Sequence, residues 1–364
     1  MVFLGHAACA ADTIRIATLN SGLKRAGPGL LLRDILTAKD PQVLAARDMI
    51  VAVDPDILLL TRFDYDLGLH ALSAFADALD QAGARYPYLF ALAPNSGVAT
   101  GLDLDGDGRK GTARDAQGYG AFAGNGGMAL LSRLPIDARN ARDFSGLLWQ
   151  DFPGSRLASL PVGNQTSPGA NELQRLSSVG HWDVPVILPD GAALHLFAYH
   201  AGTPAFDGPE DRNGRRNHDE NTFWLQYLDG ALAWPPPDAP FVILGDANLD
   251  PSDGDGERAA IRALLEHPDI QDPLPKSAGA AEAALVQGGV NAQHRGDPAL
   301  DTADWRDQNG PGNLRVDYVL PSSDLKVLDA GVFWPASSDP NAAILSGRDP
   351  RVSWHGLVWV DISR

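Results

Sequence analysis

The chain has 364 residues, of which 44% are hydrophobic and 21% are charged, and its formal net charge at pH 7 is -17. This composition is typical of a protein that folds around a sizeable core, so it excludes a predominantly disordered chain. The negative charge argues against a protein that binds long nucleic acid through a basic surface, so any anionic substrate must be bound by local positive charge.

The first residues have the pattern of a processing signal. Small residues surround the single cysteine, Cys9. This pattern resembles the end of a secretory signal peptide with cleavage near Ala11. The apolar part is short and no basic residue precedes it, so an ordinary cytosolic N-terminus is the alternative. We expect a signal-peptide remnant at 1–11, one domain at 12–364 and a periplasmic or secreted location. No run of 18 apolar residues occurs, so no membrane span is expected.

Short apolar runs bounded by turn residues predict strands that are buried on at least one face. Segments with helical spacing of apolar residues lie between them, so we predict an α/β or layered α+β fold. Two polar stretches, 95–126 and 269–312, show no clear periodicity and are expected to be long loops. The predicted strands are 14–20, 56–63, 127–133, 193–200, 241–246, 315–320 and 355–362, and the predicted helices are 40–53, 67–83, 221–233 and 257–266.

Polar side chains stand at the ends of most of these strands, where a rigid sheet can present them to a ligand. The "GDAN" stretch (245–248) is the most informative, because Asp246 can accept a proton from water and Asn248 can orient that water or a phosphoryl oxygen. An Asx turn that shapes the following loop is the alternative interpretation. The other polar residues at strand ends are Asn20, Arg62, Asp64, His200, Asp317 and His355.

Several motifs, in chain order, resemble the endonuclease/exonuclease/phosphatase superfamily, in particular its secreted bacterial phytase-like or esterase-like branch. They include "IATLN" (16–20), "GDANLDPSDGDG" (245–256), "NLRVDYVLPS" (313–322) and "HGLVWVDI" (355–362), and the resemblance covers about residues 13–363. It implies a four-layer α/β sandwich, in which two packed mixed β-sheets are flanked by helices. It also implies hydrolysis of phosphate esters with a divalent metal, usually magnesium.

The resemblance implies a catalytic role for each polar residue that matches the family pattern. Asp246 would activate the attacking water, Asn248 would orient it, and His200 would donate to the phosphate. Asp317 would hold the imidazole of His355, which would donate to a phosphoryl oxygen and stabilise the charge of the transition state.

Three positions depart from the pattern that the resemblance implies. Asn20 is present as a metal or phosphate ligand, but the family usually has its chief metal-binding glutamate where this chain has Arg62. It usually has an aspartate in place of Trp354 and often an aromatic residue in place of Gly126. Mg²⁺ needs hard oxygen ligands, so a guanidinium in place of the main carboxylate makes magnesium binding there unfavourable.

Three interpretations of Arg62 stay open. Its planar charged fork could bind the phosphoester directly, the metal could have moved to Asp64, Asp246 or another acid, or catalysis could be lost. A salt bridge from Arg62 to Asp64, Asp66 or Asp246 would instead be a purely structural role. Trp354 either packs in the core or stacks on a ligand.

Two further charged stretches carry alternatives. "DLDGDGRKG" (103–111) has Asp103, Asp105 and Asp107 at alternate positions, as at the start of an EF-hand loop, but the closing glutamate is absent. It is either a structural calcium site or a solvated acidic turn. "EDRNGRRNHDE" (210–220) contains Arg215 and Arg216, which would either attract an anionic substrate or form a network with neighbouring acids.

We therefore expect a secreted hydrolase of small phosphate mono- or diesters whose magnesium site is altered or absent. The alternative is a catalytically inactive ligand-binding protein with the same fold. The sequence does not determine the substrate or the oligomeric state.

Overall fold

The computed structural model describes residues 13–159, 169–345 and 354–363. The predicted signal-peptide remnant at 1–11 lies outside the described residues. In the described part of the chain, no helix combines the length and the apolar character that a membrane crossing requires.

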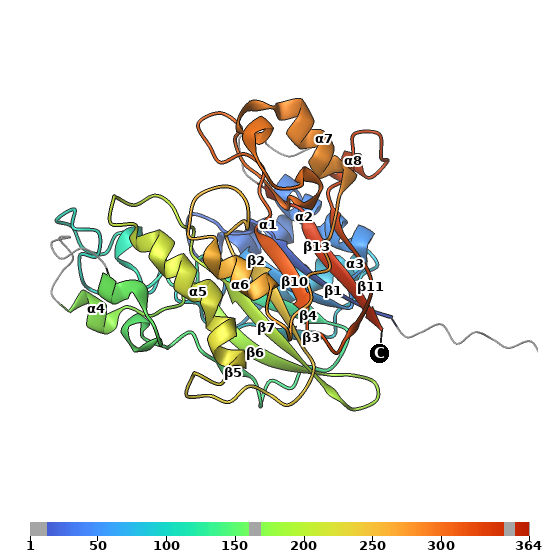
Figure 1. Ribbon diagram of the computed structural model, residues 1–364. Coiled ribbons are helices and arrows are strands. Elements are labelled where there is room, and N and C mark those ends of the chain that lie inside the picture. The colour runs from blue at the N-terminus through green and yellow to red at the C-terminus, as the bar shows by residue number, and fades with distance from the viewer. Residues whose placement is uncertain (1–12, 160–168, 346–353, 364) are drawn as a thin grey trace, which may run out of the picture.

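Two β-sheets pack face to face and carry helices on their outer surfaces (Figure 1). Both sheets are mixed, because β1–β2 and β7–β8 are parallel pairs among antiparallel ones. The first sheet has the strand order β11 (Lys326–Phe333), β13 (Leu357–Ser363), β1 (Thr13–Asn20), β2 (Ile57–Phe63), β4 (Gly127–Ser132) and β3 (Tyr88–Phe90). The second has the order β10 (Asp317–Pro321), β8 (Phe241–Asp246), β7 (Ala193–His200), β6 (Gly180–Ile187) and β5 (Arg142–Asp143), and β12 (Trp354–His355) pairs separately with β9 (Ala303–Asp304).

The alternation of apolar residues along the strands creates one core between the sheets and one beneath each helical layer. In β1, Ile16 faces the second sheet and packs near Leu244 of β8, whereas Leu19 faces the helices of the first sheet. Successive strand residues point to opposite faces, so a strand that is apolar on both faces is buried between two layers. The first sheet is covered by α1 (Leu30–Thr37), α2 (Pro41–Val53) and α3 (His70–Gln81), and the second by α5 (Arg212–Leu228) and α6 (Ala259–Leu265). The predicted four-layer sandwich is confirmed.

Two expectations about the elements were wrong. The helix predicted over 221–233 begins at Arg212 and ends at Leu228, so most of the charged stretch 210–220 forms its first turns instead of preceding it. The stretch 269–312, expected to be a loop, contains α7 (Ala278–Gln287) and β9. Ser277 starts α7, because its side chain accepts from the backbone N–H groups of Gly279 and Ala280. The short helices α4 (Ala170–Leu173) and α8 (Ala342–Leu345) complete the α-helices of the described part of the chain.

Candidate active site

The ends of β1, β7 and β8 and the start of β10 lie at the same edge of the sandwich, and this places their polar terminal residues together. His200 of β7 lies opposite Asp246 of β8 in parallel register, and Asp317 of β10 lies opposite Asp246 in antiparallel register. Asn20 reaches across from β1 of the first sheet, and its Nδ2 donates to Asp246 Oδ2 at 2.7 Å. Four residues that are far apart in the sequence therefore form one cluster.

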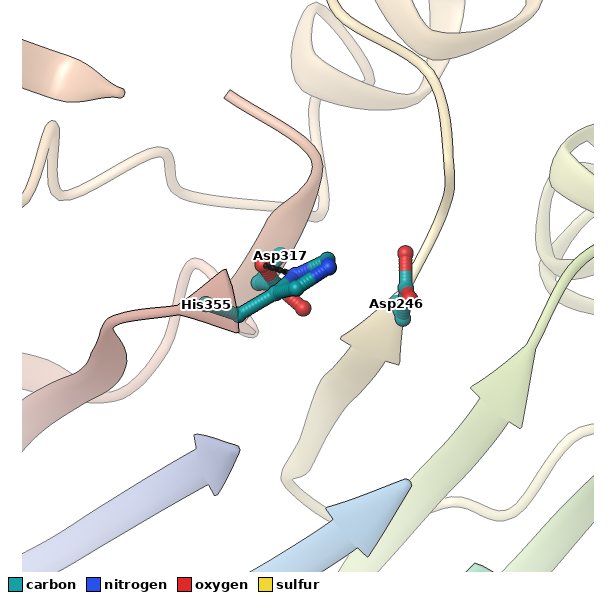
Figure 2. A group of neighbouring side chains, drawn as sticks. All are labelled: Asp246, Asp317 and His355. Atoms are coloured by element: carbon teal, nitrogen blue, oxygen red, sulfur yellow. Dashed lines mark hydrogen bonds and ion pairs between the residues drawn. The ribbon is translucent and has the colours of Figure 1, made fainter. Parts of the chain in front are cut away.

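His355 joins this cluster from β12, the short strand that precedes β13. Its Nδ1 lies 2.6 Å from Asp317 Oδ2, and its Nε2 lies 3.3 Å from Asn20 Nδ2. Figure 2 shows the imidazole beside Asp317, with Asp246 across from both at the tip of its strand. Thr302 Oγ1 donates to the same Asp317 oxygen at 2.8 Å, and the ring of Trp305 meets the imidazole edge to face at 5.2 Å. The orientation of His355 is thus fixed on both sides.

Asp246 is fully buried, and its environment favours the neutral carboxylic acid. Burial and the negative charge of Asp317 raise its pKa to about 7, although His355 and hydrogen bonds from Asn248 and Asn20 act in the opposite direction. The backbone N–H of Asn248 donates to Asp246 Oδ1 at 2.8 Å. A carboxyl group that titrates near neutral pH can act as a general base.

His200 contributes a neutral imidazole. Burial and the positive charges of Arg62, His355 and Lys24 hold its pKa well below the usual value. Its Nε2 lies 3.5 Å from Asp246 Oδ2, and its Nδ1 has no hydrogen-bond partner among the described residues. Asp317 Oδ1 is also buried without such a partner. Buried polar atoms are nearly always paired, and these two unpaired atoms lie in one cluster of residues at strand ends, where a bound ligand would pair them.

Arg62 projects from a β-bulge. The register between β2 and β4 shifts between Thr61 and Phe63, and Arg62 has a φ of 53°, in the left-handed region that side chains larger than glycine rarely adopt. A bulge changes the direction in which a side chain leaves the strand. The guanidinium lies close enough to lower the pKa of Lys24 and of His200, so it contributes positive charge to this cluster.

Within the described part of the chain, Arg62 makes no hydrogen bond or ion pair, so the structural salt bridge considered from the sequence is not observed there. The acids proposed for it have other partners. Asp64 accepts from the backbone N–H groups of Arg25 and Gly126, both at 2.8 Å. Asp66 accepts from the first N–H groups of α3.

Lys24, in the loop that follows β1, is a cation of this cluster that sequence reasoning missed. A Cβ placed on Gly126, whose φ is 64°, would lie 3.4 Å from Lys24 Cδ and 3.9 Å from Arg62 Cα. These are ordinary contact distances, so the Lys24 side chain packs over Gly126 beside Arg62, and the positive φ favours glycine there. Burial and the charge of Arg62 lower the pKa of Lys24 to about 8, against the opposite effect of Asp64. The position of Lys24 four residues after Asn20 could have indicated it.

Residues 26–339 match the sequence model of the endonuclease/exonuclease/phosphatase family. The chain belongs to this family. The structure is similar to that of an endonuclease/exonuclease/phosphatase from Beutenbergia cavernae, with 17% identity over 96% of this chain and 71% of that one and a TM-score of 0.52. It is also similar to a family protein from Leptotrichia buccalis, with 13% identity over 96% of this chain and 100% of that one and a TM-score of 0.51. Comparison with curated proteins gives no match. Membership supports a role in phosphoester hydrolysis.

Endonuclease/exonuclease/phosphatase proteins typically use a divalent metal, but the residues around Asn20 do not fit Mg²⁺. Arg62 stands on the second strand in place of a carboxylate, Asn20 Oδ1 lies 3.3 Å from the N–H of Gly22, and both oxygens of Asp64 accept hydrogen bonds. A bound dication would lie against a fixed positive charge. A divalent ion therefore has too few oxygen ligands at this position.

A second group could hold an ion elsewhere in the site. Asp246, Asp317 and His355 each offer one ligand atom, and these atoms lie within 4.8 Å of one another. Asp317 Oδ2 already accepts from His355 and Thr302, so an ion bound through that oxygen would compete with the hydrogen bonds that orient the imidazole. Dependence of the activity on added metal distinguishes an ion bound at this second position from a site that works without metal.

Trp354 packs rather than facing the cluster as a stacking surface. Its Nε1 donates to Asp304 Oδ2 at 3.0 Å, and its ring meets that of Trp334 at 4.8 Å. It is half-buried against the apolar cores of both faces of the first sheet. The expectation that Trp354 binds substrate is therefore replaced by a packing role, which was the alternative.

The basic stretch in α5 also has a structural role. Arg216 is buried, and its guanidinium donates to the carbonyl oxygens of four residues, Gln117, Arg175, Leu176 and Ser177. These contacts anchor α5 to the loops beside it and leave the group inaccessible to substrate. Arg215 donates to the carbonyl of Glu210. The prediction that Arg216 binds substrate is corrected, and nothing in the structure directs Arg215 at the cluster.

The acidic loop differs from the arrangement that its spacing suggested. Asp103, Asp105 and Asp115 offer ligand atoms within 4.8 Å of one another, whereas Asp107 is not part of this group. Asp107 instead accepts from the N–H of Arg109. The buried Asp115, which follows the position of the missing glutamate, takes the place that the EF-hand pattern gave to Asp107.

Proposed function

We propose that this protein hydrolyses small phosphate esters, and that the guanidinium of Arg62 binds the phosphoryl group where related proteins use a metal ion. One observation carries the proposal: a cation without an ion-pair partner among the described residues projects from a bulge beside His200 and His355. Guanidinium matches the geometry of phosphate oxygens and stays charged at all working pH values.

The proposed reaction needs no group that the chain lacks. Asp246 accepts a proton from a water molecule, the water oxygen forms a bond to phosphorus, and the bond from phosphorus to the ester oxygen breaks. Asn248 is placed to orient the water, because its Nδ2 donates to the carbonyl of Ala201 at 2.8 Å and its Oδ1 can accept from water. Its φ of 49° is a conformation that asparagine tolerates better than most residues.

His355 and Arg62 would stabilise the charge that develops on the phosphoryl oxygens. Burial disfavours a protonated imidazole, but the charge and hydrogen bond of Asp317 outweigh this effect and raise the pKa of His355. This environment favours the protonated imidazole, which would carry positive charge and donate through Nε2 to a phosphoryl oxygen. Groups that are already oriented before the reaction stabilise charge more effectively than water, which must reorient.

The substrate class follows from where the positive charge lies. The chain as a whole carries a net charge of -17, so a long polyanion would be repelled by most of the surface. A single phosphoryl group needs only local positive charge, which Arg62 and Lys24 supply, together with His355 when its imidazole is protonated. We therefore propose a small phosphate mono- or diester and disfavour long nucleic acid.

Two narrower proposals concern the location of the protein and a second metal site. The pattern around Cys9 supports export to the periplasm or medium, and N-terminal sequencing of the protein recovered from those fractions tests it. The loop that holds Asp103, Asp105 and Asp115 is proposed as a structural calcium site, tested by calcium titration of the chelator-treated protein and of Asp103→Asn.

The activity test uses purified protein with a panel of phosphate monoesters and diesters, in EDTA, in Mg²⁺ and in Ca²⁺. Asp246→Asn is the matched control, because it keeps the shape of the side chain and removes the base. Activity that survives EDTA and is lost in Asp246→Asn supports the proposal. Activity that requires a cation indicates a relocated ion. No activity above the control on any ester contradicts hydrolysis and favours a ligand-binding role.

A further inference from the structure

Lys24 differs from the other residues of the site, because it also lines a separate cavity. This cavity of about 650 Å³ lies beside the site and is lined by Lys24, Arg25, Gln42, Tyr119, Ala121 and Asn125, among others. We propose that Lys24 is the general acid that protonates the leaving alcohol, and that the cavity holds the alcohol portion of the ester. The proposal rests on the hydrolytic function above and extends it to a catalytic residue and a leaving-group pocket.

Gly126 is the first observation that supports this role. It has a positive φ of 64°, so a larger residue would be strained there, and any Cβ would lie 3.4 Å from Lys24 Cδ. The lysine side chain thus passes over the glycine backbone and lies beside Arg62. An aromatic side chain at this position would occupy the path of the lysine. The two departures from the family pattern are therefore related, because Lys24 packs over Gly126 and so lies beside Arg62.

The charges around Lys24 suit a proton donor. Arg62 on β2 disfavours a second positive charge nearby, while Asp64, in the segment after β2, favours it. Arg25 is adjacent in the chain, and His200 of β7 is neutral. Burial and the charge of Arg62 lower the pKa of Lys24 to about 8, against the opposite effect of Asp64. The ammonium is therefore still protonated at neutral pH but loses its proton more readily than an exposed lysine.

The other cation of the cavity cannot take this role. Arg25 Nε lies 2.7 Å from Asp34 and its Nη2 lies 3.1 Å from Asp40, and a guanidinium does not lose its proton in proteins. Lys24 makes no ion pair within the described part of the chain. The side chain of Tyr119 is 70% exposed at the rim and offers an aromatic face to an organic group.

The proposed general base and the proposed general acid then follow strands of different sheets. Asp246 follows β8 of the second sheet and takes the proton of the attacking water, whereas Lys24 follows β1 of the first sheet, beside Arg62. When the bond from phosphorus to the ester oxygen breaks, the electron pair stays on that oxygen and Lys24 Nζ supplies a proton to it. The neutral amine regains a proton from solvent, and Asp246 releases the proton that it took from water. Charge and atoms balance over the cycle.

The test compares two esters on Lys24→Met and Lys24→Arg. An alkyl phosphate needs a proton on its leaving alkoxide, whereas a nitrophenyl phosphate leaves as a stabilised phenolate and does not. We expect kcat/KM for the alkyl ester to fall by roughly 100-fold or more in both variants, the range of general acid catalysis. For the nitrophenyl ester, Lys24→Arg should keep activity within roughly tenfold, because arginine retains the charge but cannot donate the proton.

Lys326→Met is the matched control. This exposed lysine pairs with Ser363, and so does Thr13 at the start of β1. It therefore lies at the end of the strands that is far from Asn20, which is the last residue of β1. Thermal unfolding of each variant checks that the fold is retained. If Lys24→Met is unstable, the comparison of the two esters is made with Lys24→Arg alone.

Several outcomes would overturn the inference without touching the proposed function. The first is that Lys24→Arg still hydrolyses the alkyl ester as wild type does. The second is that Lys24→Arg loses activity equally on both esters. The third is that the wild type hydrolyses the nitrophenyl ester but not the alkyl ester. A wild-type protein that hydrolyses neither ester would contradict the proposed function itself, and the role of Lys24 would fall with it.

Discussion

The side-chain amide of Asn20 donates to the carboxyl of Asp246 over 2.7 Å, and this hydrogen bond joins the two sheets of the sandwich at the edge where their strands end. Asn20 ends β1 of the first sheet and Asp246 ends β8 of the second. Both side chains are buried. The bond places the proposed general base at a fixed position between the sheets, so the geometry of the site depends on how the sheets pack.

Asn20→Asp tests this contact through its effect on the pKa of Asp246. A second carboxylate in place of the amide adds negative charge and removes a donor, and both changes disfavour ionised Asp246. We expect the acid limb of the pH profile of kcat/KM to move up by roughly one unit or more. Asn20→Ala, which removes the donor without adding charge, should shift the limb less. An acid limb at the same pH in all three proteins would show that Asp246 is not the titrating base.

The pH dependence of the wild type should be bell-shaped. Asp246 must be ionised to accept a proton, so activity should rise through its pKa of about 7. Lys24 must be protonated to donate, so activity on an alkyl ester should fall as the pH rises through its pKa of about 8. Loss of the proton from His355 would also lower activity at high pH, and Lys24→Arg separates the two. If the alkaline limb persists unchanged in Lys24→Arg, Lys24 is not its origin.

Asp246→Asn should make the stability of the protein less dependent on pH between pH 5 and pH 8, while abolishing activity. Burial and Asp317 raise the folded-state pKa of Asp246 to about 7, above the unfolded value. This group therefore stabilises the fold below its unfolded pKa, and that stability is lost as the pH rises to about 7. The asparagine variant lacks this titration, so between pH 5 and pH 8 its free energy of unfolding should fall by roughly 1 to 3 kcal/mol less than that of wild type, measured by urea denaturation at both pH values. Asp77→Asn, at an exposed position, is the control, and an equal fall in stability for Asp246→Asn and wild type between the two pH values would contradict the account.

Thr302 should matter because it holds Asp317. Its hydroxyl donates to Asp317 Oδ2 at 2.8 Å and accepts from the backbone N–H groups of Val316 and Asp317, both at 3.0 Å. Thr302→Val keeps the shape and leaves these buried groups unpaired, so we expect a loss of roughly 1 to 3 kcal/mol of stability. The kcat should also fall, because the imidazole of His355 loses its fixed partner. Thr302→Ser retains the hydroxyl and should lie close to wild type in both measurements.

Apolar runs were enough to predict the strands that carry the site. Asn20, His200 and Asp246 end runs that are apolar on both faces, and such runs are recognisable because they are buried between two layers. The helix α7 was missed because its alanine-rich sequence has no apolar stripe, and its start depends on the cap made by Ser277. The early start of α5 was missed because its first turns bury polar groups such as Arg216 and Asn217.

Contacts set by tertiary packing could not be predicted from the sequence. The β-bulge that turns Arg62 toward the cluster depends on the register of β2 against β4. The position of Lys24 depends on Gly126, which is 102 residues away in the chain. The four carbonyl oxygens that occupy Arg216 come from two separate loops. In each case the local pattern is compatible with several roles, and only the neighbouring segment selects one of them.

The most direct test of the account is the activity of wild type, Arg62→Lys and Arg62→Glu in EDTA and across a titration of Mg²⁺. If Arg62 binds the phosphoryl group in place of an ion, the wild type should be equally active with and without Mg²⁺. Arg62→Lys should keep part of that activity, since it retains the charge but not the fork. Arg62→Glu should be inactive in EDTA and regain activity as Mg²⁺ is added, because a carboxylate restores the missing ligand. A wild-type enzyme that is inactive in EDTA and restored by Mg²⁺ would contradict the central claim.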